Sequence, residues 1–352
     1  MNISELDFDL PEGLIARYPA DERRLSRLLV VHAGDGLWQH QDFSDFPQYF
    51  EAGDLLVLND TKVVPALLQM YKETGGNIEM LFLRAEGQVA RCMLSGSRIR
   101  VGLELFSADN QGKVLLKEKL PRGEWLVELE SGDWISFLNQ YGCPPLPPYI
   151  RRMRGLDNDD EIHQSDFERY QTIWAKNNGS VAAPTASLHF DDEMMHQLST
   201  AGVNIGYLSL HVGQGTFLPI SCDTVEEHPI HSEQFVIDDH LAKAIESTRA
   251  SGGKIVAGGT TVCRALEAWA AGHHGETDLM ILPGHTFNVV DALLTNFHTP
   301  RSTLLALVAA MAERHGANIG IDFVKKVYAA AIADNYRFYS YGDASLWLPP
   351  KP

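Results

Sequence analysis

The sequence predicts an α/β protein that carries a separate β-rich unit in its first half. Three observations favour this fold class. Short apolar or alternating segments with Gly, Asp and Asn turns occupy residues 78–129, strand-like segments alternate with amphipathic helices over 192–316, and the proline-rich run 143–148 stands between them. Proline cannot continue a strand ladder or a helix, so this run is typical of a domain border.

The β-rich unit is predicted from strands that recur at short intervals. Turn residues at 109–112 and 131–133 separate them, and this spacing is typical of a compact all-β unit. The strand candidates are Ile78–Leu83, Val89–Leu94, Val114–Leu116 and Trp125–Leu129.

The α/β part is predicted from apolar residues at helical spacing that follow short strand-like segments. The expected helices are Asp192–Ala201, Asp239–Ser251, Val262–Ala271 and one that starts at Thr299–Pro300 and ends near Gly316. The expected strands are Val203–Leu210, Lys254–Ala257, Met280–Leu282 and Phe287–Val290.

Composition limits the class of protein. With 352 residues and 45% hydrophobic content the chain can bury a substantial core in about two domains. No apolar run approaches the roughly 20 residues that span a bilayer, and the N-terminus is acidic, so we expect a cytoplasmic protein without membrane contact. The four cysteines are far apart without a Cys-x-x-Cys pair, which favours free thiols over a disulfide or a thiolate zinc site.

Three polar runs predict a ligand site. Each places a histidine beside hydroxyl-bearing or small residues: His189 in the run 180–190, His211 in 210–217 and His298 in 295–303. Burying such groups without partners costs about 1–3 kcal/mol each, so packing alone explains them poorly. Taken singly, each histidine is equally well explained as a structural residue bonded to a backbone carbonyl.

A second candidate site lies where a predicted strand meets a helix at Gly258-Gly259-Thr260-Thr261. Free amides at a helix start attract an anion such as a methionine carboxylate, and Arg264 one turn later could add positive charge. The run lacks the spacing of a dinucleotide site or a P-loop, so an ordinary helix cap explains it as well.

Two further features allow both a functional and a structural interpretation. His228 and His231, with Glu233 nearby, fit an acid/base cluster or a pair of metal ligands, but no third ligand stands at an obvious spacing. The aromatic run Tyr336–Tyr341 fits core packing or a platform that stacks on adenine or an unstacked base.

The chain resembles the S-adenosylmethionine:tRNA ribosyltransferase-isomerase family of queuosine biosynthesis from Phe8 to Trp347. The resemblance rests on ordered blocks that include the three polar runs. The other blocks are Leu58-Asn59-Asp60-Thr61-Lys62-Val63-Val64-Pro65-Ala66, Lys72-Glu73-Thr74-Gly75-Gly76, Pro145-Leu146-Pro147-Pro148-Tyr149-Ile150, Glu227-His228-Pro229-Ile230-His231-Ser232-Glu233 and Tyr336-Arg337-Phe338-Tyr339-Ser340-Tyr341-Gly342-Asp343-Ala344.

The resemblance implies both a fold and a reaction. Residues 1–64 and 151–352 would form one discontinuous α/β domain with a mixed, barrel-like sheet, and residues 65–150 a smaller inserted β-barrel-like domain. The ribosyl part of S-adenosylmethionine would move to 7-aminomethyl-7-deazaguanine at the wobble position of a tRNA with a G-U-N anticodon. Epoxyqueuosine would form, adenine and methionine would leave, and a monomer would need no metal or prosthetic group.

This chemistry needs a base near the sulfonium, a donor that helps adenine leave, and a pocket without water. We therefore assign three groups of site residues. The catalytic candidates are His189, His211, His228, His231, His298 and Asp60; the donor-binding candidates are Gly259, Thr260, Thr261, Arg264, Thr185 and Asn296; and the tRNA-binding candidates are Arg17, Arg23, Arg24, Arg27, Arg151 and Arg152, with Arg154 beside them.

The net charge of −17 repels a polyanion at long range, so tRNA binding should depend on few phosphate contacts at these arginines. The chain also departs from the family pattern. Leu67 stands where Arg is usual, Ser187 replaces Gly, Gly258 replaces Val, and Ala292 replaces Gly. Leu67 matters most, because an alkyl chain cannot replace an arginine that binds an anion.

Two alternatives follow from these features. A divergent member could bind tRNA or S-adenosylmethionine without catalysis. A metal-dependent hydrolase could instead use the histidines as ligands.

Overall fold

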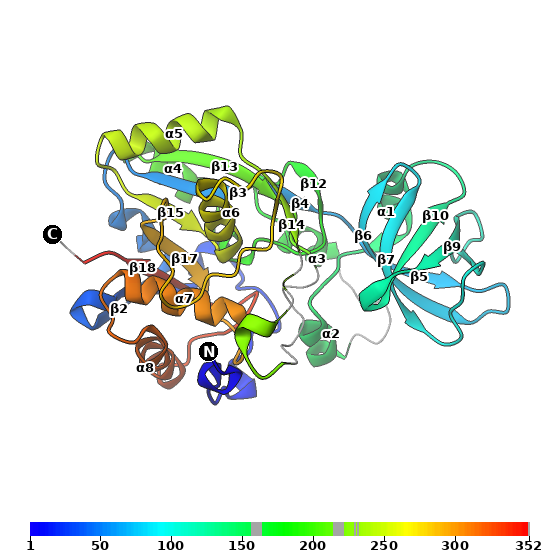
Figure 1. Cartoon of the computed structure of the whole chain (residues 1–352), viewed down its shortest axis with the longest axis horizontal. Helices are drawn as coiled ribbons and strands as arrows, with labels where there is room; N and C mark the ends of the chain where they lie inside the picture. Colours follow the sequence, from blue (N-terminus) through cyan, green and yellow to red (C-terminus); the bar gives the residue numbers. More distant parts are fainter. Residues whose placement is uncertain (156–163, 214–221, 229, 231, 351–352) are drawn as a thin grey trace.

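The structure is a computed structural model that describes residues 1–155, 164–213, 222–228, 230 and 232–350. It confirms the α/β fold class: a large mixed sheet flanked by helices, and a smaller antiparallel barrel beside it (Figure 1). None of the helices within these residues is long and apolar enough to cross a membrane.

The large sheet has nine strands, and four neighbouring strands at its centre are parallel. Their carboxyl ends therefore meet at one edge of the sheet: β13 (Asn204–Leu210), β3 (Leu55–Asn59), β15 (Ile255–Gly258) and β17 (Ala292–Asn296). Strands β14 (Glu233–Val236) and β16 (Glu276–Thr277) extend the sheet antiparallel beyond β13. On the other side, β18 (Ala344–Leu348), β1 (Arg27–His32) and β2 (Leu37–Asp42) complete it.

Both faces of the large sheet are buried. Alternate residues of a strand point to opposite faces, so each strand contributes to two separate cores. Leu29 and Val31 of β1 belong to one core, and Leu28 and Val30 to the other. The first core is covered by helices α5 (Asp239–Ala250), α6 (Thr260–Ala270), α7 (Thr303–Arg314) and α8 (Gly320–Ala333). The second packs against α4 (Asp192–Thr200) and the 3-10 segment η5 (Phe43–Tyr49).

The smaller unit is a closed six-stranded barrel. The two strands at opposite ends of its sheet pair with each other, through Tyr71 and Phe106. The strand order is β5 (Leu67–Tyr71), β6 (Asn77–Glu86), β7 (Val89–Gly96), β10 (Glu124–Leu129), β9 (Lys113–Lys119) and β8 (Glu104–Phe106), and β11 (Gly142–Cys143) adds to β5. Helix α1 (Trp134–Tyr141) contributes Trp134, Phe137 and Leu138 to the barrel core. The four predicted barrel strands are confirmed.

A short parallel ladder lies between the two units. Strand β4 (Thr61–Val63) pairs with β12 (Asn177–Ser180), and the barrel and the helices α2 (Pro148–Arg154) and α3 (Gln164–Arg169) lie between these two strands in the sequence. The barrel core receives Val64 and Val181 from the ends of this ladder. The domain limits at 65 and 150 stay a prediction.

Two predicted strands, Met280–Leu282 and Phe287–Val290, are wrong. Ile281, Phe287, Val289 and Val290 are buried as strand residues would be, but the backbone over 278–290 joins no ladder. The amides of Asn288, Val289 and Val290 instead donate to the buried carboxylate of Glu267 on α6, at 2.7–2.9 Å. A side chain thus supplies the acceptors that a neighbouring strand would have given.

Candidate functional site

Polar residues gather where the parallel strands end. Asp60 and Thr61 follow β3, His211 follows β13, Gly259 follows β15, and Asn296 is the last residue of β17. Ligands of open α/β sheets bind outside the carboxyl ends of the strands, so this edge is the candidate site.

His211 is held at this edge by a hydroxyl. Its Nδ1 lies 2.8 Å from Oγ1 of Thr61, and that hydroxyl also lies 3.5 Å from the carbonyl oxygen of Asn177. If the Thr61 hydroxyl donates to that carbonyl, it accepts from Nδ1–H, and Nε2 of His211 is then the unprotonated nitrogen. Burial lowers the pKa of His211, and the negative charge of Asp60 opposes this effect. The imidazole is therefore neutral near pH 7 and suited to accept a proton.

Asp60 stands beside this imidazole but is itself engaged. Its Oδ1 accepts a 2.5 Å hydrogen bond from the hydroxyl of Ser209, and its Oδ2 accepts from the amide of Asn177 at 3.0 Å. These bonds hold the side chain of Asp60 next to His211 with both carboxylate oxygens occupied, and they agree with an electrostatic role better than with proton transfer by Asp60 itself.

The imidazole of His211 lies directly against Gly179, whose φ is +148°. A Cβ at position 179 would be 2.9 Å from Nε2 and 2.8 Å from Cε1 of the ring. Only glycine combines this backbone angle with so close an approach, so Gly179 defines where the ring can sit.

His211 and Gly179 open onto a groove of about 770 Å³ between the sheet and the barrel. The barrel supplies the opposite wall, which includes Trp134 and the arginines Arg84, Arg91 and Arg122. Glu233 lines the groove on the side of the sheet. Of the five predicted histidines, only His211 lines this groove within the described residues.

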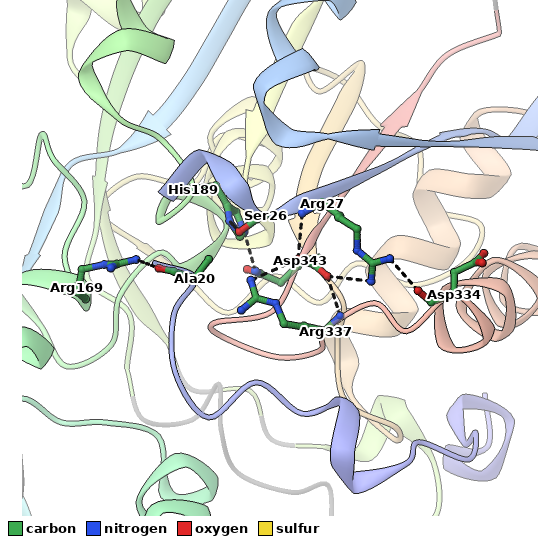
Figure 2. A network of polar contacts seen from close by, with 9 residues as sticks. Ala20, Ser26, Arg27, Arg169, His189, Asp334, Arg337 and Asp343 are labelled. Carbon is green, nitrogen blue, oxygen red and sulfur yellow. Dashed lines mark hydrogen bonds and ion pairs between the residues drawn. The ribbon is translucent and has the colours of Figure 1, made fainter. Parts of the chain in front are cut away.

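His189 lies in a buried polar network behind this edge (Figure 2). Its Nδ1 lies 2.9 Å from the hydroxyl of Ser26, and its Nε2 lies 3.2 Å from the amide nitrogen of Asn296. Oδ1 of Asn296 accepts from the hydroxyl of Thr185 at 2.8 Å. Burial lowers the pKa of His189 to about 4, so the ring is neutral and both its nitrogens are occupied.

The same network fixes the C-terminal aromatic run. The buried carboxylate of Asp343 accepts from the backbone amides of Arg27 and Arg337 at 3.0 and 2.8 Å (Figure 2). Tyr336 and Phe338 are completely buried, and Arg27 lies over the ring of Tyr336 at 3.9 Å. Core packing therefore accounts for Tyr336 and Phe338, which are not accessible for stacking on a base, whereas Tyr339 is half-buried.

His298 and His228 do not line the groove. Nε2 of His298 lies 2.9 Å from the hydroxyl of Thr295, and burial lowers the pKa of His298 to about 3. His228 lines a cavity of about 40 Å³ together with Arg264 and Glu233. His231 lies outside the described residues. Within the described residues no group of three or more His, Cys, Asp or Glu is placed to hold a metal ion.

The predicted anion site at the start of α6 is arranged differently from the expectation. Gly259 is the N-cap with φ +120°, so the helix begins at Thr260, two residues before the predicted start. Nη1 of Arg264 forms a 2.6 Å ion pair with Oε2 of the buried Glu233, and Nε donates to the carbonyl of Leu279. The charge of Arg264 is thus already balanced.

Glu233 is the residue whose role the sequence did not reveal. Its Oε1 accepts from the amide of Gly213 at 3.2 Å, two residues after His211, so the Arg264–Glu233 pair supports the segment that carries the imidazole. Glu233 belongs to the block that ends Pro-Ile-His-Ser-Glu, so the resemblance already pointed to this segment. The sequence interpretation assigned the acid/base role to the two histidines of the block instead.

Most of the predicted tRNA-binding arginines make contacts within the protein. Arg23 donates to the carbonyls of Leu188, Glu168 and Gln171, and Arg151 forms an ion pair with Glu79 at 2.8 Å. Arg154 pairs with the buried Asp166 at 2.9 Å, and Arg24 lies 3.5 Å from Glu22. Arg27 is engaged as described above. Arg17 and Arg152 are exposed and have no ion pair within the described residues.

The departures from the family pattern lie at buried positions. Leu67 lines a cavity of about 170 Å³ that Arg151 and Glu79 also line. This cavity therefore contains a guanidinium, from Arg151 of α2, although residue 67 itself is not an arginine. The hydroxyl of Ser187 lies 3.4 Å from the carbonyl of Gly258. A Cβ at position 258 would lie 2.5 Å from Cδ2 of Leu58, so glycine lets β15 pack closely there. Ala292 is buried at the start of β17.

The fold and the site define a two-unit α/β protein with a groove between a β-barrel and the edge of the large sheet where β13 ends. Comparison with known proteins identifies it further. The model of the queuosine biosynthesis protein family matches residues 3–347, and the chain belongs to this family.

Individual relatives agree over nearly the whole length. The chain is 43% identical to the S-adenosylmethionine:tRNA ribosyltransferase-isomerase of Trichlorobacter lovleyi, over 98% of this chain and 99% of the relative. It is 42% identical to the enzyme of that name from Aquifex aeolicus, over 99% and 100%. The crystal structure of S-adenosylmethionine tRNA ribosyltransferase from Thermotoga maritima is similar with a TM-score of 0.54 and 32% identity, covering 97% of this chain and 99% of that one.

Proposed function

We propose that this protein is an S-adenosylmethionine:tRNA ribosyltransferase-isomerase. It transfers and isomerises the ribosyl part of S-adenosylmethionine onto 7-aminomethyl-7-deazaguanine at the wobble position of a tRNA with a G-U-N anticodon, forming epoxyqueuosine and releasing adenine and methionine. Full-length relatives at 41–43% identity carry this enzyme name and support the proposal.

The single observation from the structure that supports it is the placement of His211. A neutral imidazole faces a groove of about 770 Å³, is held by Thr61, and has the fixed charge of Asp60 beside it. A base that removes a proton next to a sulfonium needs a lone pair at near-neutral pH, and the carboxylate stabilises the imidazolium that forms. His211 is therefore the base in this proposal.

The donor sits against the strand ends in this proposal. The amides from Gly259 to Thr261 lie at the start of α6, which is the positive end of the helix, and they bind the methionine carboxylate. Thr185 and Asn296 contact the donor from the neighbouring segments, and His189 orients Asn296. The sulfonium serves as the electron sink, and the barrel wall closes the groove against water.

The reaction is tested by mass spectrometry of nucleosides from the acceptor tRNA, before and after incubation with the protein and S-adenosylmethionine. Epoxyqueuosine and an equal amount of free adenine are expected. Binding of tRNA without either product would support the non-catalytic alternative and contradict the proposal.

The role of His211 is tested with two variants. His211→Asn should lower the rate by about 100-fold or more, because it removes the base. Gly179→Ala should lower it comparably with every chemical group intact, since the added Cβ occupies the position of the ring. Gly102→Ala is the matched control, because Gly102 also has a positive φ but has open space around it. Near-normal turnover of folded His211→Asn would rule out this base.

A further inference from the structure

The barrel wall of the groove carries arginines whose hydrogen-bonding capacity is unused. The guanidinium groups of Arg84 and Arg91 donate no hydrogen bond within the described residues, and each lies 3.5–3.6 Å from one carboxylate oxygen, of Glu276 and Glu124 respectively. Both side chains are more than 40% exposed. Such exposed pairs contribute about 0–1 kcal/mol, so an incoming anion can replace them at little cost.

The relative position of these two arginines is unfavourable for the barrel alone. Arg84 of β6 and Arg91 of β7 are direct cross-strand partners, next to a β-bulge between Phe82 and Arg84. Like charges directly opposite one another destabilise a sheet. A local arrangement that costs stability is typical of a functional site, and bulges often re-aim side chains there.

Arg122 adds a third cation to the same wall. It is exposed, lines the groove, and adopts φ +60° within the 3-10 segment η6 (Pro121–Gly123). The acidic residues along the groove are each engaged: Glu233 with Arg264, Asp133 with the amide of Ser136, Glu124 with Arg91, and Glu276 with Arg84 and the hydroxyl of Ser232.

The distribution of charge along the chain agrees with this location. Residues 65–150 contain nine Lys or Arg and ten Asp or Glu, whereas the whole chain has 29 and 46. Nearly all of the net negative charge therefore lies outside the barrel, and a polyanion meets its weakest repulsion there.

We propose that Arg84, Arg91 and Arg122 bind the phosphodiester backbone of the RNA beside the nucleoside that reacts at His211. This inference rests on the proposed function. A guanidinium binds two phosphate oxygens at once, and several adjacent arginines suit a backbone with one charge per nucleotide better than the single carboxylate of the donor. This proposal places the main RNA contact on the barrel, whereas the sequence predicted it at the N-terminal arginines and those of 151–154.

The test measures binding of the acceptor tRNA to the full-length protein across a salt titration. The variant is the double substitution Arg84→Gln and Arg91→Gln, and the control is Arg98→Gln and Arg100→Gln, two exposed barrel arginines outside the groove lining. The test variant should bind tRNA about tenfold more weakly, and the slope of log K against log salt should fall by about 1–2. The control should match the parent.

Calorimetry with S-adenosylmethionine separates the two anions that these arginines could hold. Donor affinity of the test variant should equal that of the parent. Unchanged tRNA affinity and slope would overturn the proposal, and so would a loss confined to donor binding. Failure of the proposed function itself would appear separately, as absence of epoxyqueuosine with the parent protein.

Discussion

At the residue scale, the buried histidines determine how stability depends on pH. Burial lowers the pKa of His189 and of His315 to about 4 in the folded protein, whereas an exposed histidine titrates near about 6.5. Both rings are neutral when folded. The folded pKa values are depressed, so the stability that these neutral rings provide is fully present above about pH 6.5 and decreases as the pH falls toward 4.

We predict that the free energy of unfolding falls between pH 6.5 and 5, by up to about 1.4 kcal/mol per pH unit for each such histidine. Urea unfolding at several pH values measures this slope. His315→Gln should make the slope shallower, and His240→Gln, at an exposed position on α5, should leave it unchanged. Equal slopes for all three proteins would show that His315 does not titrate in this way.

Sequence reasoning located the residues at the strand ends but not their roles. His189, His211 and His298 were equivalent as histidines in threonine-containing polar runs, and only the structure separates the one that lines the groove from the buried His189 and the half-buried His298. Arg23, Arg27 and Arg154 looked like surface cations, because a sequence does not show which backbone carbonyls a folded loop leaves without partners.

At the element scale, periodicity predicted regular elements and failed where a side chain replaced a strand partner. Helices α4, α5 and α6 and strand β13 agree with the predictions to within one or two residues. Residues 280–290 have the apolar pattern of strands, yet their amides bond to Glu267. The pattern reports burial, and burial alone does not fix the hydrogen-bond partner.

Glu267→Gln should destabilise the protein by about 2–4 kcal/mol, because a neutral amide replaces a carboxylate that accepts three backbone hydrogen bonds in a buried site. Chemical unfolding at neutral pH measures the change. Glu246→Gln on the exposed face of α5 is the matched control and should change stability by less than about 0.5 kcal/mol. A similarly small effect for Glu267→Gln would mean that these bonds add little to stability.

At the scale of the whole molecule, we propose that residues 1–64 and 151–352 form one domain and residues 65–150 another. The barrel has its own hydrophobic core, separate from the two cores of the large sheet, although Val64 and Val181 enter it from the connecting ladder. The closed barrel removes its own sheet edges and so does not need the larger unit for strand pairing.

Calorimetry should therefore resolve two unfolding transitions. Leu116→Ala in the barrel core and Leu56→Ala in the large sheet each remove a completely buried side chain, at a cost of about 2–5 kcal/mol. Each variant should lower the midpoint of one transition and leave the other nearly unchanged. A single transition that both variants shift equally would indicate that the chain unfolds as one unit.

The ladder between the units joins the barrel to the chemistry. Thr61, which holds His211, is the first residue of β4, and the barrel begins six residues later at Leu67. On the other strand of the ladder, Gly179 forms the seat of the same imidazole. A tilt of the barrel that widens the groove would therefore displace both Thr61 and Gly179, the two residues that position the imidazole of His211. We therefore predict that the position of the barrel and the alignment of the proposed base are coupled, so that proton removal beside the sulfonium requires the barrel to stay in its place beside the ladder. In Leu116→Ala, amide exchange at Val63 and Val212 rising together would reveal this linkage, and independent rates would refute it.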